Sequence, residues 1–306
     1  MAFNWQTFRT RALTAIVFVV IMLGGLLWNH WSFLVLFSVI HFGCWWEYFK
    51  LVEKINTTYF HIYTKLGLML IGYGLMLWFC GPAYSIGGYG LKENFSLPVS
   101  AAGFILLLTG IFQKHKIELK SFGAAALGLV YISLSWGLMM DLSGFVRKIF
   151  YDFGIGYFPP LDYFPVLLPC VIIVSMWIND TMAYVVGSFI GKSPLSKISP
   201  KKTWEGTIGG VILCILAVGF LFSSLPTDIV FPGYHFWFPK VVWFSIAGIS
   251  AIFGTFGDLL ESKLKRMAGV KDSGQIMPGH GGFLDRFDSL LLATPFVWFF
   301  VKLFMQ

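Results

Sequence analysis

Long apolar stretches alternate with short polar ones along most of the chain. Nine of them are candidate membrane spans: residues 11–29, 31–49, 65–81, 97–112, 121–140, 164–187, 207–225, 239–260 and 287–305. A helix of about twenty apolar residues crosses a hydrocarbon core of about 30 Å. In lipid, a single segment satisfies its backbone groups only as a helix. The pattern therefore predicts an all-α, polytopic integral membrane protein with about nine transmembrane helices.

The composition agrees with this class. Of the 306 residues, 57% are hydrophobic and 12% charged, whereas soluble domains carry about 25% charged residues. We therefore treat residues 1–306 as a single membrane domain. The net charge of +7 is explained by basic cytoplasmic loops, so no nucleic-acid partner is predicted.

The distribution of Lys and Arg predicts the orientation. With the N-terminus in the cytoplasm, nine crossings leave five of the 22 basic residues outside and 17 inside. The five outer residues are Lys92, Arg147, Lys148, Lys240 and Lys302. Because cytoplasmic loops are enriched in Lys and Arg, the N-terminus is predicted to be cytoplasmic and the C-terminus outside.

A first polar region begins near the inner end of the sixth span. Asp180 lies within that span, where an ionisable group usually faces a polar cavity, and Tyr184 follows on the same helical face. The next loop carries Lys192, Lys197, Lys201 and Lys202 among serines and a threonine. Cations and hydroxyl groups suit phosphate oxygens, but contact with anionic lipid headgroups explains such a loop equally well.

A second polar region runs from Asp258 to Ser289. If the eighth span continues as a helix, Asp258, Glu261, Ser262 and Lys265 fall on one face. Asp285 and Asp288 are three residues apart at the start of the ninth span. Carboxylates from two helix ends suit Mg²⁺, which prefers oxygen ligands. The alternative for the Asp-x-x-Asp pair is a helix start favoured by the helix dipole.

His280 stands between glycines in this second region. Gly279, Gly281 and Gly282 allow the backbone to approach a ligand closely. The imidazole is a candidate donor to a phosphate or a proton shuttle, although a lone loop histidine is more often structural. Two other glycine sets, Gly187/Gly191 and Gly206/Gly210, have the spacing typical of close helix packing.

Basic side chains, hydroxyl groups and a carboxylate-bound divalent cation are the usual components of phosphoryl or nucleotidyl transfer. Their position at a bilayer face favours a lipid phosphate as the acceptor. The residues by themselves leave the base of the nucleotide open.

The polar regions resemble a known family. The run Ser262-x-Leu264-Lys265-Arg266-x₄-Lys271-Asp272-x-Gly274, followed by Pro278-x-His280-Gly281-Gly282-Phe283-x-Asp285-Arg286-Phe287-Asp288, is similar to the signature of phosphatidate cytidylyltransferases (CDP-diacylglycerol synthases). The segments 180–187 and 199–206 also resemble that family. The likeness is strong from about residue 175 to 290 and weak over 1–140, so residues 164–306 are expected to form the catalytic core.

The resemblance implies transfer of CMP from CTP to phosphatidate, which releases pyrophosphate and leaves CDP-diacylglycerol in the membrane. It implies Mg²⁺, with room for a second cation such as K⁺, a homodimer, and an active site on the cytoplasmic face of the cell membrane. The expected metal ligands are Asp258, Asp285 and Asp288. The expected catalytic residues are Asp285, Asp288, Lys265, Arg266 and His280, and the expected substrate-binding residues are Asp180, Lys201, Lys202, Ser262, Lys271 and Arg286.

Two other functions remain open. A CTP-dependent polyprenol or lipid kinase would place similar groups on another lipid and would form no lipid-linked CMP. An ion-coupled transporter would use Asp180 and Asp258 as a cation pathway, but the sequence lacks the internal repeat that many transporters show.

Overall fold

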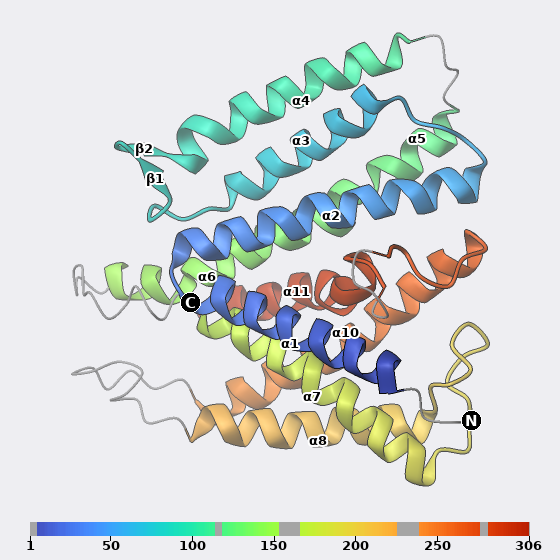
Figure 1. Cartoon of the computed structure of the whole chain (residues 1–306). Coiled ribbons are helices and arrows are strands. Elements are labelled where there is room, and N and C mark those ends of the chain that lie inside the picture. Colours follow the sequence, from blue (N-terminus) through green and yellow to red (C-terminus); the bar gives the residue numbers. More distant parts are fainter. Residues whose placement is uncertain (1–4, 114–117, 153–165, 225–238, 276–280, 306) are drawn as a thin grey trace. The chain divides into compact units, whose positions relative to one another are not determined.

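The computed structural model describes residues 5–113, 118–152, 166–224, 239–275 and 281–305, and the elements of this part of the chain are helices joined by loops, with one short hairpin (Figure 1). The elements are α1 (Trp5–Leu27), α2 (His30–Asn56), α3 (Ile62–Trp78), β1 (Ser85–Ile86), β2 (Tyr89–Gly90), the π-helix η1 (Leu91–Phe95), α4 (Ser96–Ile111), α5 (Leu119–Ala126), the π-helix η2 (Leu129–Leu134), α6 (Ser135–Asp152), α7 (Leu167–Ile190), α8 (Trp204–Ser223), α10 (Lys240–Met267) and α11 (Leu284–Phe304).

The prediction of an all-helical polytopic membrane protein is confirmed. Within the described residues, seven helical segments are long and apolar enough to cross a membrane: His30–Asn56, Leu91–Ile111, Leu119–Phe145, Leu167–Ile190, Trp204–Ser223, Lys240–Met267 and Leu284–Phe304. Two shorter apolar helices, Leu13–Leu27 and Ile62–Trp78, lie at the first and third predicted spans. The fourth predicted span is longer than expected, because η1 runs directly into α4.

The chain divides into two compact units. One contains Met1–Met140 and Leu264–Phe287, and the other contains Asp141–Lys263 and Asp288–Gln306. Helices α10 and α11 each contribute residues to both units. These are packing units, so the functional division between residues 1–140 and 164–306 stays a prediction.

Helix α2 forms the core of the first unit. Its ends follow from local chemistry: Asn29 and Ser32 form a capping box, and Thr57 ends the helix in the left-handed conformation at φ 47°. Trp45 is fully buried and donates a hydrogen bond to Ser133 Oγ on η2 over 2.8 Å. This bond ties α2 to η2 in the interior of the first unit.

Helices α3 and α4 lie side by side in the first unit, joined by the β1–β2 hairpin (Figure 1). The two-residue turn uses Gly87 at φ 58° and Gly88 at φ 85°, and paired left-handed residues match the twist of a hairpin. The helices approach closely at Gly67, where an added Cβ would lie 2.6 Å from Leu107 N. Small residues at the interface permit this backbone contact.

Helices α7 and α8 pack against each other in the second unit (Figure 1). A Cβ added at Gly206 would lie 2.7 Å from Ala183 O, and one at Gly210 would lie 2.7 Å from Ala183 Cβ. The prediction that these glycines serve helix packing is confirmed. Thr203 caps the N-terminus of α8, and its hydroxyl accepts a hydrogen bond from Gly206 N.

The basic loop between α7 and α8 is folded back on itself. Leu195 N donates to Lys202 O over 2.7 Å, and Trp204 N donates to Ser193 O over 2.9 Å. The carboxylate of Glu205, in the first turn of α8, accepts hydrogen bonds from the backbone N–H groups of Lys192 and Ser193. These contacts give the loop a defined shape and fix Lys202 close to the start of α8.

Candidate active site

The second unit contains a pocket between α7, the start of α8 and α10, with several polar side chains in its lining. The pocket encloses about 380 Å³. Its lining consists of Asn179, Asp180, Ala183, Tyr184, Gly187, Ser188, Lys201, Lys202, Thr203, Thr207, Thr255 and Asp258. Three predicted substrate-binding residues, Asp180, Lys201 and Lys202, therefore line one cavity together with the predicted metal ligand Asp258.

Lys202 and Asp258 form an ion pair in this pocket. The lysine comes from the loop before α8 and the aspartate from α10, 56 positions later. Ser262 lies one helical turn beyond Asp258 and donates a hydrogen bond to Asp258 Oδ1 over 3.2 Å. The continuation of the eighth span as a helix to Met267 is confirmed, and it sets Ser262 beside Asp258.

Asn179 has an acceptor atom that no described residue uses. The residue is 3% exposed, and its Oδ1 has no hydrogen-bond partner among the described residues. Its Nδ2 lies 3.4 Å from Thr255 Oγ1. A buried polar atom without a partner costs about 1–3 kcal/mol. Because Asn179 lines the pocket, a ligand that donates a hydrogen bond there would remove this cost.

Helix α11 reaches α10 in the second unit close to Asp258. A Cβ added at Gly257 would lie 2.5 Å from Asp288 O and 3.0 Å from Ser289 Cα. Asp288 is 8% exposed, and its Oδ1 accepts a hydrogen bond from Ser289 N over 2.7 Å. Gly257 thus allows the backbone of α10 to contact that of α11 at the predicted ligand Asp288.

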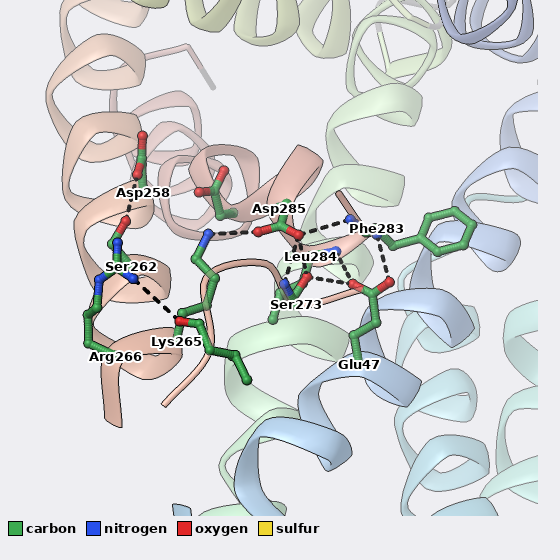
Figure 2. A network of polar contacts seen from close by, with 12 residues as sticks. Glu47, Asp258, Ser262, Lys265, Arg266, Ser273, Phe283, Leu284 and Asp285 are labelled. Carbon is green, nitrogen blue, oxygen red and sulfur yellow. Dashed lines mark hydrogen bonds and ion pairs between the residues drawn. The ribbon is translucent and has the colours of Figure 1, made fainter. Parts of the chain in front are cut away.

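The first unit holds a separate polar network around Asp285 (Figure 2). Asp285 Oδ1 pairs with Lys265 Nζ at 2.7 Å. Asp285 Oδ2 accepts hydrogen bonds from Ser273 N at 2.9 Å and Gly282 N at 2.9 Å, and it lies 2.8 Å from Ser273 Oγ, whose single proton it shares with Glu47. Two predicted catalytic residues, Asp285 and Lys265, are therefore in direct contact.

A residue from the N-terminal half completes this network. The carboxylate of Glu47, on α2, accepts hydrogen bonds from Ser273 Oγ, Phe283 N and Leu284 N (Figure 2). Glu47 is 1% exposed. Glu47 was not predicted, because it lies outside the motifs that carry the family resemblance. The available signal was an acidic residue inside an apolar span, where an ionisable group is costly and usually functional.

The other predicted site residues lie mostly on the surface. Arg266, Lys271 and Arg286 are exposed, as is Lys201 at the edge of the pocket. His280 lies outside the described residues, so its predicted role stays a prediction. Asn179, which stands next to Asp180 in the sixth predicted span, lines the pocket with it. Ser273 and Thr255 also belong to the two polar clusters and were not predicted, since a single Ser or Thr has no distinctive sequence pattern.

The carboxylates have the donor chemistry that a hard divalent cation prefers. Asp258 and Asp285 each hold a lysine ammonium group, which shows that both attract a cation. Among the residues described, no three His, Cys, Asp or Glu side chains gather into a group that fits a metal ion. The joint metal site of Asp258, Asp285 and Asp288 therefore stays a prediction.

Comparison with known proteins identifies the class. The chain matches the Cytidylyltransferase family over residues 9–304, and it belongs to that family. Its relatives include the phosphatidate cytidylyltransferase of Bacillus subtilis, 34% identical over 212 residues, which covers 68% of this chain and 69% of the relative. The phosphatidate cytidylyltransferase of Thermotoga maritima is 32% identical over 223 residues, covering 70% of this chain and 73% of the relative.

A plant relative is similar to a comparable degree. Phosphatidate cytidylyltransferase 4, chloroplastic, of Arabidopsis thaliana is 34% identical over 218 residues, which is 68% of this chain. The matched region spans about half of that relative, at 53% of its length. The resemblance stated from the sequence motifs is therefore confirmed at the level of the family.

Proposed function

We propose that this protein transfers CMP from CTP to phosphatidate, which yields CDP-diacylglycerol and pyrophosphate. The family match over residues 9–304 and the names of the relatives support this activity. The observation that carries it in the structure is the pocket that brings Lys201, Lys202 and Asp258 together. Ammonium groups beside a carboxylate suit a triphosphate and its cation.

In the proposed reaction, a phosphate oxygen of phosphatidate attacks the α-phosphorus of CTP in line. The bond from that phosphorus to the bridging oxygen of the β-phosphate breaks, and pyrophosphate leaves with the electron pair. The attacking phosphate is already an anion, so no strong general base is required. Lys202 and Lys265 stabilise the negative charge that develops on the phosphoryl oxygens.

Mg²⁺ bound by Asp258 and Asp288, with Asp285, would supply Lewis-acid stabilisation of the phosphate charge. The support is the donor chemistry of these carboxylates. Asp285 is already bonded to Lys265, Ser273 and Gly282, so its larger contribution is to orient Lys265. The proposal also includes a second cation, such as K⁺, bound beside Mg²⁺.

The orientation is proposed from the charge distribution, with the N-terminus and the pocket on the cytoplasmic side of the cell membrane. The support is the excess of Lys and Arg in the segments assigned to that side. Single cysteines at Lys197 and Lys92, in a background without the four native cysteines, test it. A membrane-impermeant maleimide should label the Lys92 position in intact cells and the Lys197 position only after lysis. The reverse pattern contradicts the proposal.

The homodimer implied by the family resemblance is also proposed. The mass of the protein in detergent micelles, measured by light scattering with the detergent subtracted, should equal two chains. A mass of one chain at all protein concentrations contradicts it.

The decisive experiment for the activity uses proteoliposomes with phosphatidate and labelled CTP. The lipid product should carry CMP, which its mass shows, and Asp285→Asn and Asp288→Asn should each lower turnover at least tenfold. Glu93→Gln, which changes an exposed acid on η1, is the matched control and should retain wild-type turnover. A lipid monophosphate without linked CMP would identify a lipid kinase, and wild-type turnover in both aspartate variants would remove their proposed role.

A further inference from the structure

Glu47 places a carboxylate in the interior of the first unit. Glu47 is 1% exposed. Burial of a charged group is costly unless the charge is paired and hydrogen-bonded. Three donors supply the hydrogen bonds of this carboxylate: Ser273 Oγ at 2.7 Å, Leu284 N at 2.8 Å and Phe283 N at 3.0 Å. All three donors belong to the segment that carries the family signature.

Two of these donors are backbone groups at the start of α11. Helix α11 begins at Leu284, and the first N–H groups of a helix have no partner within the helix. An acceptor with negative charge is favoured there by both hydrogen bonding and the helix dipole. Glu47 therefore fixes the start of α11 from a helix more than 230 positions earlier in the chain.

The third donor connects Glu47 to the predicted catalytic residues. Ser273 Oγ lies 2.7 Å from Glu47 Oε2 and 2.8 Å from Asp285 Oδ2. Asp285 in turn holds Lys265 Nζ at 2.7 Å. A contiguous series of contacts runs from Glu47 through Ser273 and Asp285 to Lys265 (Figure 2).

Two glycines of the signature segment let its backbone approach the Glu47 carboxylate closely. A Cβ added at Gly274 would lie 2.0 Å from Glu47 Oε1, and one at Gly282 would lie 2.1 Å from the same atom. Phe283 packs against Gly43, one turn earlier on α2, where an added Cβ would lie 2.3 Å from the ring. The signature segment is thus fitted to this part of α2.

We propose that Glu47 is a positioning residue for the nucleotidyl transfer. It holds Ser273 and the first amide groups of α11, so that Asp285 keeps Lys265 in the arrangement that the reaction uses. The proposal rests on the proposed function of the same site. It assigns to the N-terminal half of the chain a part in catalysis that acts through other residues and does not touch substrate.

The test compares Glu47→Gln with Glu53→Gln in the full-length protein in proteoliposomes. Glu53 is a matched control, because it is also on α2 and its carboxylate also accepts a hydrogen bond from a backbone amide, Phe60 N. In addition, Glu53 forms an ion pair with Lys65. We expect kcat of Glu47→Gln to fall about 10–100-fold, with KM for CTP and phosphatidate within about threefold. The control should retain wild-type kcat at a similar loss of thermal stability. Equal kcat values for the two variants overturn the proposal.

A double-mutant cycle tests the route through Ser273. Ser273→Ala should lower kcat by itself, and its effect should shrink in the Glu47→Gln background, because residues that act through one network are not additive. If the fold-loss of kcat in the double variant equals the product of the losses in the two single variants, the proposal is overturned. If Glu47→Gln fails to fold, Ser273→Ala decides alone: wild-type kcat in that variant overturns it.

Hydrogen exchange gives a readout independent of activity. In Glu47→Gln the amides of Phe283 and Leu284 should exchange at least tenfold faster than in the wild type, whereas in Glu53→Gln they should be unchanged. Unchanged rates in Glu47→Gln overturn the proposal. Absence of CMP transfer by the wild type would overturn the proposed function instead, and the exchange rates would still decide whether Glu47 holds this segment.

Discussion

Glu47 Oε2 lies 2.7 Å from Ser273 Oγ, although the two residues are 226 positions apart. The contact brings a buried carboxylate of α2 to the segment in which the family signature lies. The N-terminal helices, which lie outside the signature motifs, therefore take part in building the predicted catalytic region.

Removal of the charge of Lys202 should impair the reaction. In Lys202→Met we expect kcat/KM to fall about 100-fold, because a cation that stabilises phosphoryl charge is lost and Asp258 loses its ion-pair partner. The measurement is CMP transfer in proteoliposomes at several CTP concentrations. Lys197→Met is the control, since Lys197 is exposed on the same loop and does not line the pocket. Equal losses in the two variants would contradict a specific role for Lys202.

Asn179→Leu should separate stability from function. The substitution removes a buried acceptor that no described residue uses. It gives up only the 3.4 Å contact of Nδ2 with Thr255 Oγ1, and that hydroxyl keeps its hydrogen bond to Ala251 O. The thermal midpoint in detergent should therefore not fall, while kcat/KM for CTP falls at least tenfold. Ser250→Ala is the control: Ser250 is buried, its Oγ has no hydrogen-bond partner within the described residues, and it lies outside the pocket lining. An Asn179→Leu variant with wild-type kinetics would show that no ligand uses this amide.

Gly206→Ala should destabilise the α7–α8 pair. The new methyl group would meet Ala183 O at 2.7 Å and Gly187 Cα at 2.9 Å, and backbone atoms cannot move aside as a flexible side chain can. We expect a loss of about 1–3 kcal/mol, seen as a lower thermal midpoint. Gly144→Ala on α6 should be neutral or stabilising, because nothing lies within 4 Å of its added Cβ and Ala favours a helix. A similar midpoint for both variants would contradict this packing argument.

Chelation of divalent cations should abolish CMP transfer. Excess EDTA in the proteoliposome assay should stop the reaction, and added Mg²⁺ should restore it, because a triphosphate substrate is normally used as its metal complex. In Asp258→Asn, the Mg²⁺ concentration for half-maximal activity should rise about tenfold. Full activity in EDTA, or an unchanged Mg²⁺ requirement in Asp258→Asn, would exclude the proposed role of this carboxylate.

Much of the candidate site was predictable because its chemistry is local in the sequence. Asp180, Lys201 and Lys202 stand out as polar residues close to apolar spans. The helical spacing of Asp258 and Ser262 predicts that they lie on one face, and there Ser262 Oγ is 3.2 Å from Asp258 Oδ1. The engagement of Asp285 by Ser273 and Gly282 was not predicted, since these bonds depend on the path of a loop between two helices.

The sequence by itself determined that the chain is a polytopic helical membrane protein of the cytidylyltransferase family. Hydropathy, helical period and the order of residues in a signature are properties of neighbouring positions, so they can be read without coordinates. Only the tertiary structure decided that Lys202 pairs with Asp258 and that Glu47 holds Ser273. The physical reason is that the sequence pattern of a helix indicates which of its faces is buried, whereas the partner of that face depends on how distant segments pack.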